Sequence, residues 1–207
     1  ALDGRAVGPG HVRDADILVT RSTTRVNREL LEGSRVRFYG SGVIGTDHID
    51  IPWIEQAGIA WQAAPGCNAD SVAQYVTAAL LWLGGRHEIT LRGLTIGVVG
   101  VGQVGRRVVA KGQALGMHVV ACDPPRKRDP RDRDAADFLS LDELLPRSDV
   151  VTVHVPLTRS GPDATWHMLD AARLAAMRPG AVLINAARGP VLDGNAWRKA
   201  QAQGLPA

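Results

Sequence analysis

The chain has 207 residues, of which 45% are hydrophobic and 22% charged, a composition typical of a soluble globular protein. The length is large for one domain and small for two complete ones. The net charge is +3, but the basic residues are dispersed among 21 acidic ones and form no basic face with interleaved aromatics, which argues against nucleic-acid binding. No apolar run reaches the ~18–20 residues of a membrane span. The two cysteines, Cys67 and Cys122, suggest neither a disulfide framework nor a metal site.

Apolar, strand-like blocks alternate with helical patterns along the whole chain, which predicts parallel α/β layers. Asp50 can cap a helix that Gly58 ends, with Pro52 in its first turn. In the first half we expect strands at 16–20, 36–40 and 59–62 and helices at 26–32 and 51–58.

A longer helix is expected over residues 68–85, ended by Gly84-Gly85. Its apolar residues fall on one stripe, which indicates a partly buried helix. We place a first domain at 1–75, a connecting helix and hinge at 76–91, and a second domain at 92–207. The stripe consists of Val72, Val76, Ala79, Leu80 and Leu83.

The second half also alternates strand-like and helical segments. Its first strand, at 95–100, is almost wholly apolar, as expected of a central parallel strand. Ser140 and Glu143 match a capping box at the start of a short helix. The Pro-broken segment of mixed charge at 124–137 is expected to be an exposed loop. We expect strands at 95–100, 118–123, 149–156 and 181–187 and helices at 103–115 and 170–177.

The run Gly100-Val101-Gly102-Gln103-Val104-Gly105 fits the G-x-G-x-x-G pattern, follows a strand and opens a helix. Gly100 would permit the tight turn, Gly102 the approach of a pyrophosphate, and Gly105 close packing of helix on strand. The helix N-terminus would present N–H groups to the phosphates. The run therefore predicts a dinucleotide site; a glycine turn with no nucleotide is the alternative.

Asp123 lies eighteen residues after Gly105, at the end of the second strand of this unit. A carboxylate there accepts hydrogen bonds from the adenosine ribose and repels a 2′-phosphate, which favours NAD over NADP. The alternative is that Arg126, Lys127 and Arg128 bind that phosphate.

The segments "LRGLTIGVVGVGQVG", "SDVVTVHVPLT" and "MRPGAVLINAARGPVLD" resemble the D-2-hydroxyacid dehydrogenases. In the first half, "TRSTTRVNRELL", "GTDHIDIPWIEQAGI" and "AAPGCNADSVAQYV" resemble the branch of that family that oxidises a phosphorylated 2-hydroxy acid in the pyridoxal 5′-phosphate pathway. The resemblance covers nearly all of the chain. It implies a partial doubly wound (Rossmann) NAD domain at 92–207, an incomplete flavodoxin-like α/β substrate domain at 1–75, and a homodimer. The lack of a disulfide framework suits a cytoplasmic protein. Family members extend further at both ends, so we expect a fragment.

Oxidation of a 2-hydroxy acid needs a nicotinamide facing C2, a cation for the carboxylate and a base for the hydroxyl proton. Arg188 follows a strand, where ligands of open α/β sheets bind, and its guanidinium could hold the carboxylate by two hydrogen bonds. The resemblance makes Arg188 catalytic and puts Ala186 and Ala187 beside the cofactor. The alternative is an arginine that caps a helix or pairs at the surface.

No residue here matches the histidine that the family uses as its acid/base, or the glutamate that tunes it. His154, in a strand, is interpreted as structural or near the cofactor. We therefore expect residues 1–207 to be inactive alone. The histidines are His11, His48, His87, His118, His154 and His167.

The resemblance also names residues on the substrate side, where the loops after the first three strands should face one cleft. Ser22 would contact substrate, and Val43 stands where the family has a substrate-binding threonine. Val155 stands where the family has a cofactor-facing threonine. Arg21 and Arg25 could bind a dianionic phosphate, or could be solvated surface. Two other functions stay open: a dehydrogenase of another 2-hydroxy acid, such as glycerate or phosphoglycerate, and a non-catalytic NAD sensor.

Overall fold

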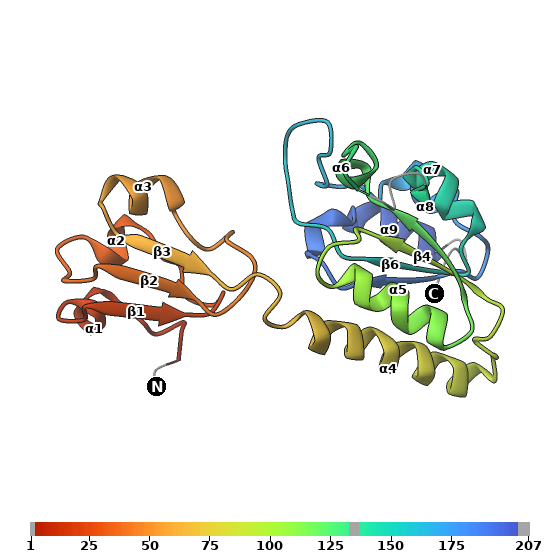
Figure 1. Ribbon diagram of the computed structural model, residues 1–207, viewed down its shortest axis with the longest axis horizontal. Helices are drawn as coiled ribbons and strands as arrows, with labels where there is room; N and C mark the ends of the chain where they lie inside the picture. The colour runs from red at the N-terminus through yellow and green to blue at the C-terminus, as the bar shows by residue number, and fades with distance from the viewer. Residues whose placement is uncertain (1–2, 133–136, 203–207) are drawn as a thin grey trace. The chain divides into compact units, whose positions relative to one another are not determined.

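The computed structural model describes residues 3–132 and 137–202. The chain divides into two compact units, Ala1–Asn68 and Ala69–Ala207, each built on its own parallel sheet (Figure 1). The prediction of a hinge at 76–91 differs from this division. Helix α4 (Ala69–His87) belongs to the second unit, because Ala73, Val76 and Leu80 are buried in the core of that unit.

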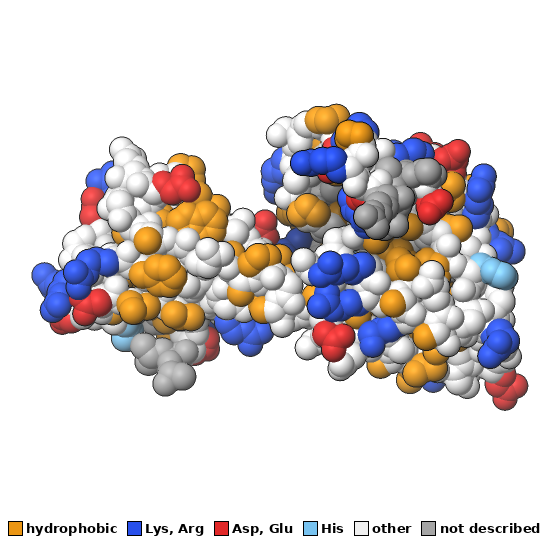
Figure 2. All heavy atoms as spheres, viewed as in Figure 1, with side chains coloured by type: hydrophobic (Ala, Val, Ile, Leu, Met, Phe, Trp, Pro, Cys, Tyr) orange, Lys and Arg blue, Asp and Glu red, His pale blue; other side chains and the backbone are white. Residues whose placement is uncertain are grey.

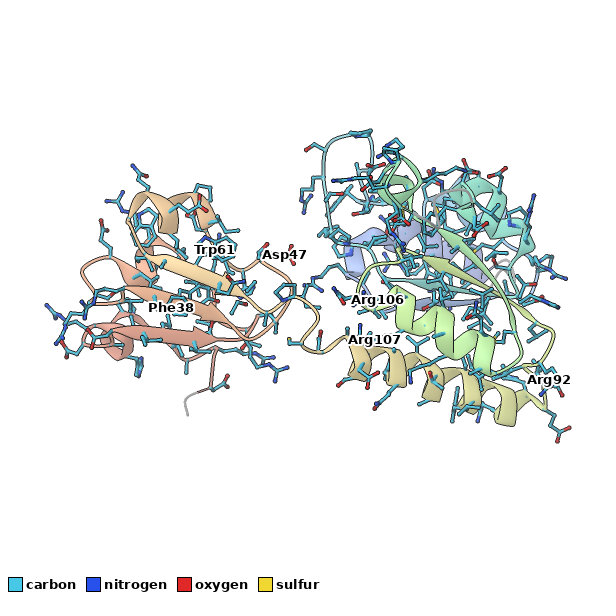
Figure 3. The ribbon with its side chains drawn as sticks, viewed as in Figure 1. Phe38, Asp47, Trp61, Arg92, Arg106 and Arg107 are labelled. Carbon is cyan, nitrogen blue, oxygen red and sulfur yellow. The ribbon has the colours of Figure 1, made fainter. Side chains whose placement is uncertain are left out.

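The first unit has a sheet of order β1-β2-β3, with all strands parallel. One face packs on a core around Tyr39, which is fully buried. On the other face Ile17 and Val19 are exposed; Figure 2 shows hydrophobic side chains over β1 and β2, and Figure 3 labels Phe38 there. The elements are α1 (Pro9–Val12), β1 (Ile17–Thr20), α2 (Arg28–Leu31), β2 (Phe38–Ser41), α3 (Ile51–Gln56) and β3 (Ala60–Ala63).

The second unit has a parallel sheet of order β5-β4-β6-β7, with helices on both faces, as the doubly wound prediction required. Strand β4 lies between β5 and β6. The chain passes from β4 to β5 on one side and then crosses back to β6 on the other side of β4. After α4 the elements are β4 (Thr95–Val99), α5 (Gly105–Ala114), β5 (His118–Cys122), α6 (Pro124–Lys127), α7 (Leu141–Leu144), η2 (Leu145–Arg147), β6 (Val150–Val153), α8 (Ala171–Ala175), β7 (Val182–Asn185), η3 (Gly189–Val191) and α9 (Gly194–Ala202).

Successive side chains of a strand point to opposite faces of the sheet, so the central strands of the second unit contribute to two hydrophobic cores. In β4, Ile96 and Val98 face the core that α4 and α5 cover, whereas Val99 faces the core of α7, α8 and α9. Each of these side chains is at most 1% exposed. Burying such a side chain stabilises the fold by about 1.5–3 kcal/mol, so β4 is the hydrophobic centre of the unit.

Two local predictions were wrong. Helix α4 does not stop at Gly84-Gly85 but runs to His87, where Glu88 at φ +54° and a hydrogen bond from the Ile89 N–H to the Gly84 carbonyl end it. The segment expected to be a loop from residue 124 begins with α6, a single turn whose N-cap is Asp123. Residues 133–136 of that segment lie outside the described residues. The capping box of Ser140 and Glu143 is confirmed.

Among residues 3–132 and 137–202, no helix combines the length and apolar character that a membrane crossing requires. Over the same ranges, no three His, Cys, Asp or Glu side chains gather in a way that could hold a metal ion.

Candidate functional site

The register of the second sheet brings four predicted site segments to one edge. Val99 pairs with Cys122 on one side and with Val153 on the other, and Val153 pairs with Asn185. The residues that follow these strands therefore leave from the same carboxyl edge, where open α/β sheets bind ligands. They are the glycine turn at 100–105, Asp123, His154 with Val155, and the segment 186–188.

The glycine turn has the geometry that a bound dinucleotide needs. Gly100 has φ +86°, a conformation that side chains rarely adopt. A Cβ on Gly105 would lie 1.9 Å from the carbonyl oxygen of Gly100, so only glycine permits this contact of helix and turn. A Cβ on Gly102 would meet nothing within 4 Å. The backbone at Gly102 thus stays open, and the turn fits a pyrophosphate.

Asp123 connects this turn to α6. Its Oδ2 accepts the Val101 N–H at 2.8 Å, and its Oδ1 accepts the Arg126 N–H at 3.2 Å. Each carboxylate oxygen still has acceptor capacity, which the ribose hydroxyls of an adenosine can use. The carboxylate is therefore fixed where the sequence predicted a ribose-binding group.

Two further cations lie at the start of α5, and sequence reasoning missed both. Arg106 donates to the side chain of Gln103, and Arg107 Nη1 donates to the Gln103 carbonyl at 2.6 Å. Figure 2 shows Lys and Arg side chains gathered at this end of α5, and Figure 3 labels Arg106 and Arg107 there. An open pocket is lined by Val101, Gly102, Gln103, Arg106, Val109, Ala110, Gln113 and Arg126. The sequence did contain a signal for these cations, because two arginines directly follow the third glycine of the motif.

His154 is a largely buried imidazole next to the glycine turn. Its Nε2 shares a hydrogen bond of 2.9 Å with Thr152 Oγ1, whereas its buried Nδ1 has no partner among the described residues. Burial lowers the pKa of His154 to about 4, so the ring is neutral at pH 7. The neighbouring Val155 lies against the turn, because a Cβ on Gly100 would come within 2.9 Å of its Cγ1.

Residues 186–188 form the turn that carries Arg188, and the side chain of Asn185 holds the backbone of this turn. Its Oδ1 accepts the Ala187 N–H at 3.0 Å and its Nδ2 donates to the Arg188 carbonyl at 3.1 Å. Arg188 itself is exposed and precedes the single turn η3. Ala186 continues the sheet by donating its N–H to the Val153 carbonyl at 3.2 Å. Sequence reasoning missed Asn185, although an amide at a strand end is a common turn-former.

In the first unit the loops after β1, β2 and β3 also start at one edge, because Thr20, Ser41 and Ala63 pair in register. The Gly42 N–H donates to the Thr20 carbonyl at 2.8 Å. Ser22 is exposed. The Val43 carbonyl accepts the Ala64 N–H and the Ser41 hydroxyl, each at 3.4 Å, so this carbonyl already serves the fold.

Comparison with known proteins identifies the class. The family model "D-isomer specific 2-hydroxyacid dehydrogenase, NAD binding domain" matches residues 71–205. The chain therefore belongs to the D-isomer-specific 2-hydroxyacid dehydrogenases and carries their NAD-binding domain.

Among curated relatives, erythronate-4-phosphate dehydrogenase of Pseudomonas syringae pv. syringae is 53% identical over 192 residues, 93% of this chain and 50% of the relative. The protein of the same name from Shigella flexneri is 48% identical over 197 residues, 95% of this chain and 51% of the relative. The chain thus spans about half the length of the curated relatives it matches.

Solved structures agree with the fold. D-lactate dehydrogenase from Aquifex aeolicus, complexed with NAD and lactic acid, has a TM-score of 0.78 and 29% identity, covering 97% of this chain and 65% of that chain. A Staphylococcus aureus formate dehydrogenase in complex with NAD also has a TM-score of 0.78, at 24% identity, covering 100% and 67%, and supports the fold alone.

Proposed function

We propose that this chain is part of an NAD-dependent dehydrogenase that oxidises 4-phospho-D-erythronate to 2-oxo-3-hydroxy-4-phosphobutanoate in pyridoxal 5′-phosphate biosynthesis. The observation that carries the proposal is the shared carboxyl edge of the second sheet. The glycine turn, Asp123 and the Arg188 turn all leave from it, so the groups proposed to bind a dinucleotide and a substrate carboxylate extend from the same edge of one sheet. The names of relatives at 48–53% identity support the substrate.

In this proposal the chain's residues bind and orient. NAD, when bound, supplies the acceptor for the hydride from C2. The turn at 100–105 would hold its pyrophosphate and Asp123 its adenosine ribose, with Val155, Ala186 and Ala187 lining the cofactor. Arg188 would fix the substrate carboxylate by two parallel hydrogen bonds, which sets the orientation of C2.

The base for the hydroxyl proton is proposed to lie outside these 207 residues. His154 follows β6 and its backbone lies beside Gly100 of the glycine turn. Because burial lowers the pKa of its ring to about 4, His154 is poorly matched to proton abstraction near pH 7. The other histidines match no acid/base position of the family. Saturable oxidation of 4-phosphoerythronate by residues 1–207 alone would contradict this.

The substrate phosphate is proposed to contact Arg21 and Arg25, with Ser22 as a further contact. All three are exposed and follow β1, whose neighbours in the sheet end at the same edge. A dianionic phosphate is well matched to such guanidinium donors. Val43 has no hydroxyl, so a contact at that position would have to use its backbone.

The test is a substrate comparison with the whole protein, following NADH formation by absorbance. We expect kcat/KM for 4-phosphoerythronate to exceed that for glycerate, 3-phosphoglycerate and D-lactate by at least about 100-fold, ~2.7 kcal/mol. The 29% identity to a lactate dehydrogenase structure makes lactate the relevant competitor. Preference for lactate or phosphoglycerate would favour another 2-hydroxy acid. Cofactor binding without turnover of any of the four would favour an NAD sensor.

A cytoplasmic homodimer is part of the same proposal. Both cysteines are free, as expected in a reducing compartment. Helix α4 exposes Tyr75 and Trp82, which are 68% and 62% exposed and seven residues apart, and therefore on one face. Sedimentation of the whole protein would test the dimer, and Trp82→Glu should shift it toward monomer.

A further inference from the structure

Arg126 is held by a carboxylate that the nucleotide motif does not include. Its Nε lies 2.5 Å from Asp132 Oδ2, and its Nη2 donates to Asp132 Oδ1 at 2.9 Å. This is the two-bond arrangement of a guanidinium on a carboxylate. The Arg126 side chain is 29% exposed and that of Asp132 14% exposed, so water screens the pair only partly.

Two other groups keep the same guanidinium against the glycine turn. Arg126 Nη1 donates to the Val101 carbonyl at 3.0 Å, and the guanidinium carbon lies 4.9 Å from the centre of the buried Phe138 ring. The Val101 N–H in turn donates to Asp123 Oδ2. Arg126 and Asp123, the proposed ribose-binding residue, thus both contact the backbone of Val101, and Arg126 lines the same pocket as Gly102.

An arginine in this place is what dinucleotide folds use to accept the 2′-phosphate of NADP. Here its donors are directed instead at the Asp132 carboxylate and the Val101 carbonyl, and the guanidinium lies over the Phe138 ring. To bind a phosphate, the guanidinium would have to give up two charge-assisted hydrogen bonds. The second arginine of the segment, Arg128, is also paired, with Asp163.

We propose that Asp132 is a specificity-determining residue for the cofactor. Because Asp132 binds Arg126, that arginine is not available to bind the 2′-phosphate of NADP. Asp123 is then the charged group that contacts the adenosine ribose. Discrimination between NAD and NADP then depends on an ion pair outside the nucleotide motif as well as on the repulsion by Asp123. The inference rests on the NAD-binding role in the proposed function and adds a residue to it.

The experiment is equilibrium titration of the whole protein with NADH and with NADPH by nicotinamide fluorescence, which requires no turnover. Asp132→Ala should lower the NADPH-to-NADH ratio of dissociation constants by about tenfold, because Arg126 gains access to the 2′-phosphate. Asp132→Asn should change the ratio in the same direction by less. Arg126→Gln alone should leave NADPH binding within about twofold of the parent, because Asp132 already occupies that arginine.

Asp129→Ala is the matched control, since Asp129 pairs with the exposed Arg131 in the same segment and carries the same charge. It should leave the ratio unchanged within about twofold. The double variant Asp132→Ala/Arg126→Gln should return to the parental ratio, which assigns the gain to Arg126. An unchanged ratio in both Asp132 variants, or a gain that survives in the double variant, overturns the inference. Failure of the parent to bind either cofactor would overturn the proposed function as well.

Discussion

The side chain of Asn185 spans the turn that carries Arg188. It donates to the Arg188 carbonyl at 3.1 Å while accepting the Ala187 N–H at 3.0 Å. The last residue of β7 therefore fixes the backbone from which the proposed carboxylate-binding guanidinium extends.

Asn185→Ala removes both hydrogen bonds, so the backbone before Arg188 loses its fixed geometry. We expect kcat/KM to fall by about 10–100-fold, with kcat affected more than KM, because misplacement of a binding group impairs hydride transfer. NADH affinity should stay within about twofold. Steady-state kinetics and fluorescence titration measure these effects. Asn195→Ala, which changes an exposed amide on α9, is the control. Equal losses in the two variants would mean that Asn185 has no positioning role.

Replacement of Arg188 tests the carboxylate contact directly. Removing one partner of a desolvated charged pair costs ~2–5 kcal/mol, so Arg188→Ala should lower kcat/KM in the whole protein by roughly 30- to 4000-fold. Arg188→Lys should be intermediate, because a point charge cannot reproduce the two-pronged contact. If Arg188→Ala kept its turnover and lost only thermal stability, Arg188 would be a scaffold residue.

The cofactor preference of the parent protein follows from Asp123. We expect NADH to bind more tightly than NADPH by at least about tenfold, ~1.4 kcal/mol, from carboxylate–phosphate repulsion. Asp123→Ala should narrow this gap in a fluorescence titration. It should also lower stability by about 1 kcal/mol, since Asp123 caps α6. Equal affinity of the unaltered protein for the two cofactors would contradict the assignment.

The buried ring of His154 predicts a dependence of stability on pH. Its pKa in the folded chain is about 4, below the ordinary 6.5, so the unfolded chain binds the additional proton between these values. Stability from this group is therefore complete above about pH 6.5 and is lost as the pH falls toward 4. Between pH 7 and 5 we expect a loss of about 2 kcal/mol in urea unfolding.

His154→Gln should flatten that pH dependence, whereas His118→Gln, at an exposed position, should leave it intact. Parallel pH profiles for the parent and His154→Gln would show that His154 does not cause the effect.

The two glycines near the end of α4 should differ in how much stability alanine adds. Gly85→Ala adds a methyl group that meets nothing within 4 Å, so we expect a gain of about 0.5–1 kcal/mol from the less flexible unfolded chain. A Cβ on Gly84 would lie 3.0 Å from the Ile89 carbonyl oxygen, so Gly84→Ala should lose most of that gain or destabilise. Urea unfolding of both variants makes the comparison. A larger gain at Gly84 would contradict it.

The sheets, their parallel direction and the glycine turn were predictable because each has a strong local signal. Val98 and Val99 give the apolar run of a central strand, and Gly100 follows them directly. The course of α4 past Gly84 was not predictable, because the helix ends at Glu88, whose φ of +54° is a conformation in which glycine is the usual residue. The pairing of Arg126 with Asp132 depends on how a loop folds back on α6, which no sequence period encodes. The turn α6 did have a signal, a capping residue at Asp123 followed by two prolines.

In the described sheet, β7 has one neighbouring strand, β6. Strands bonded on one side open locally at lower free energy than central ones such as β4. In residues 1–207 alone, amide hydrogens of Val182–Asn185 should therefore exchange with deuterium sooner than those of Thr95–Val99. The Arg188 turn thus follows one of the two outer strands of the described sheet, β5 and β7, and a carboxylate ligand bound there should be visible as slowed exchange in β7.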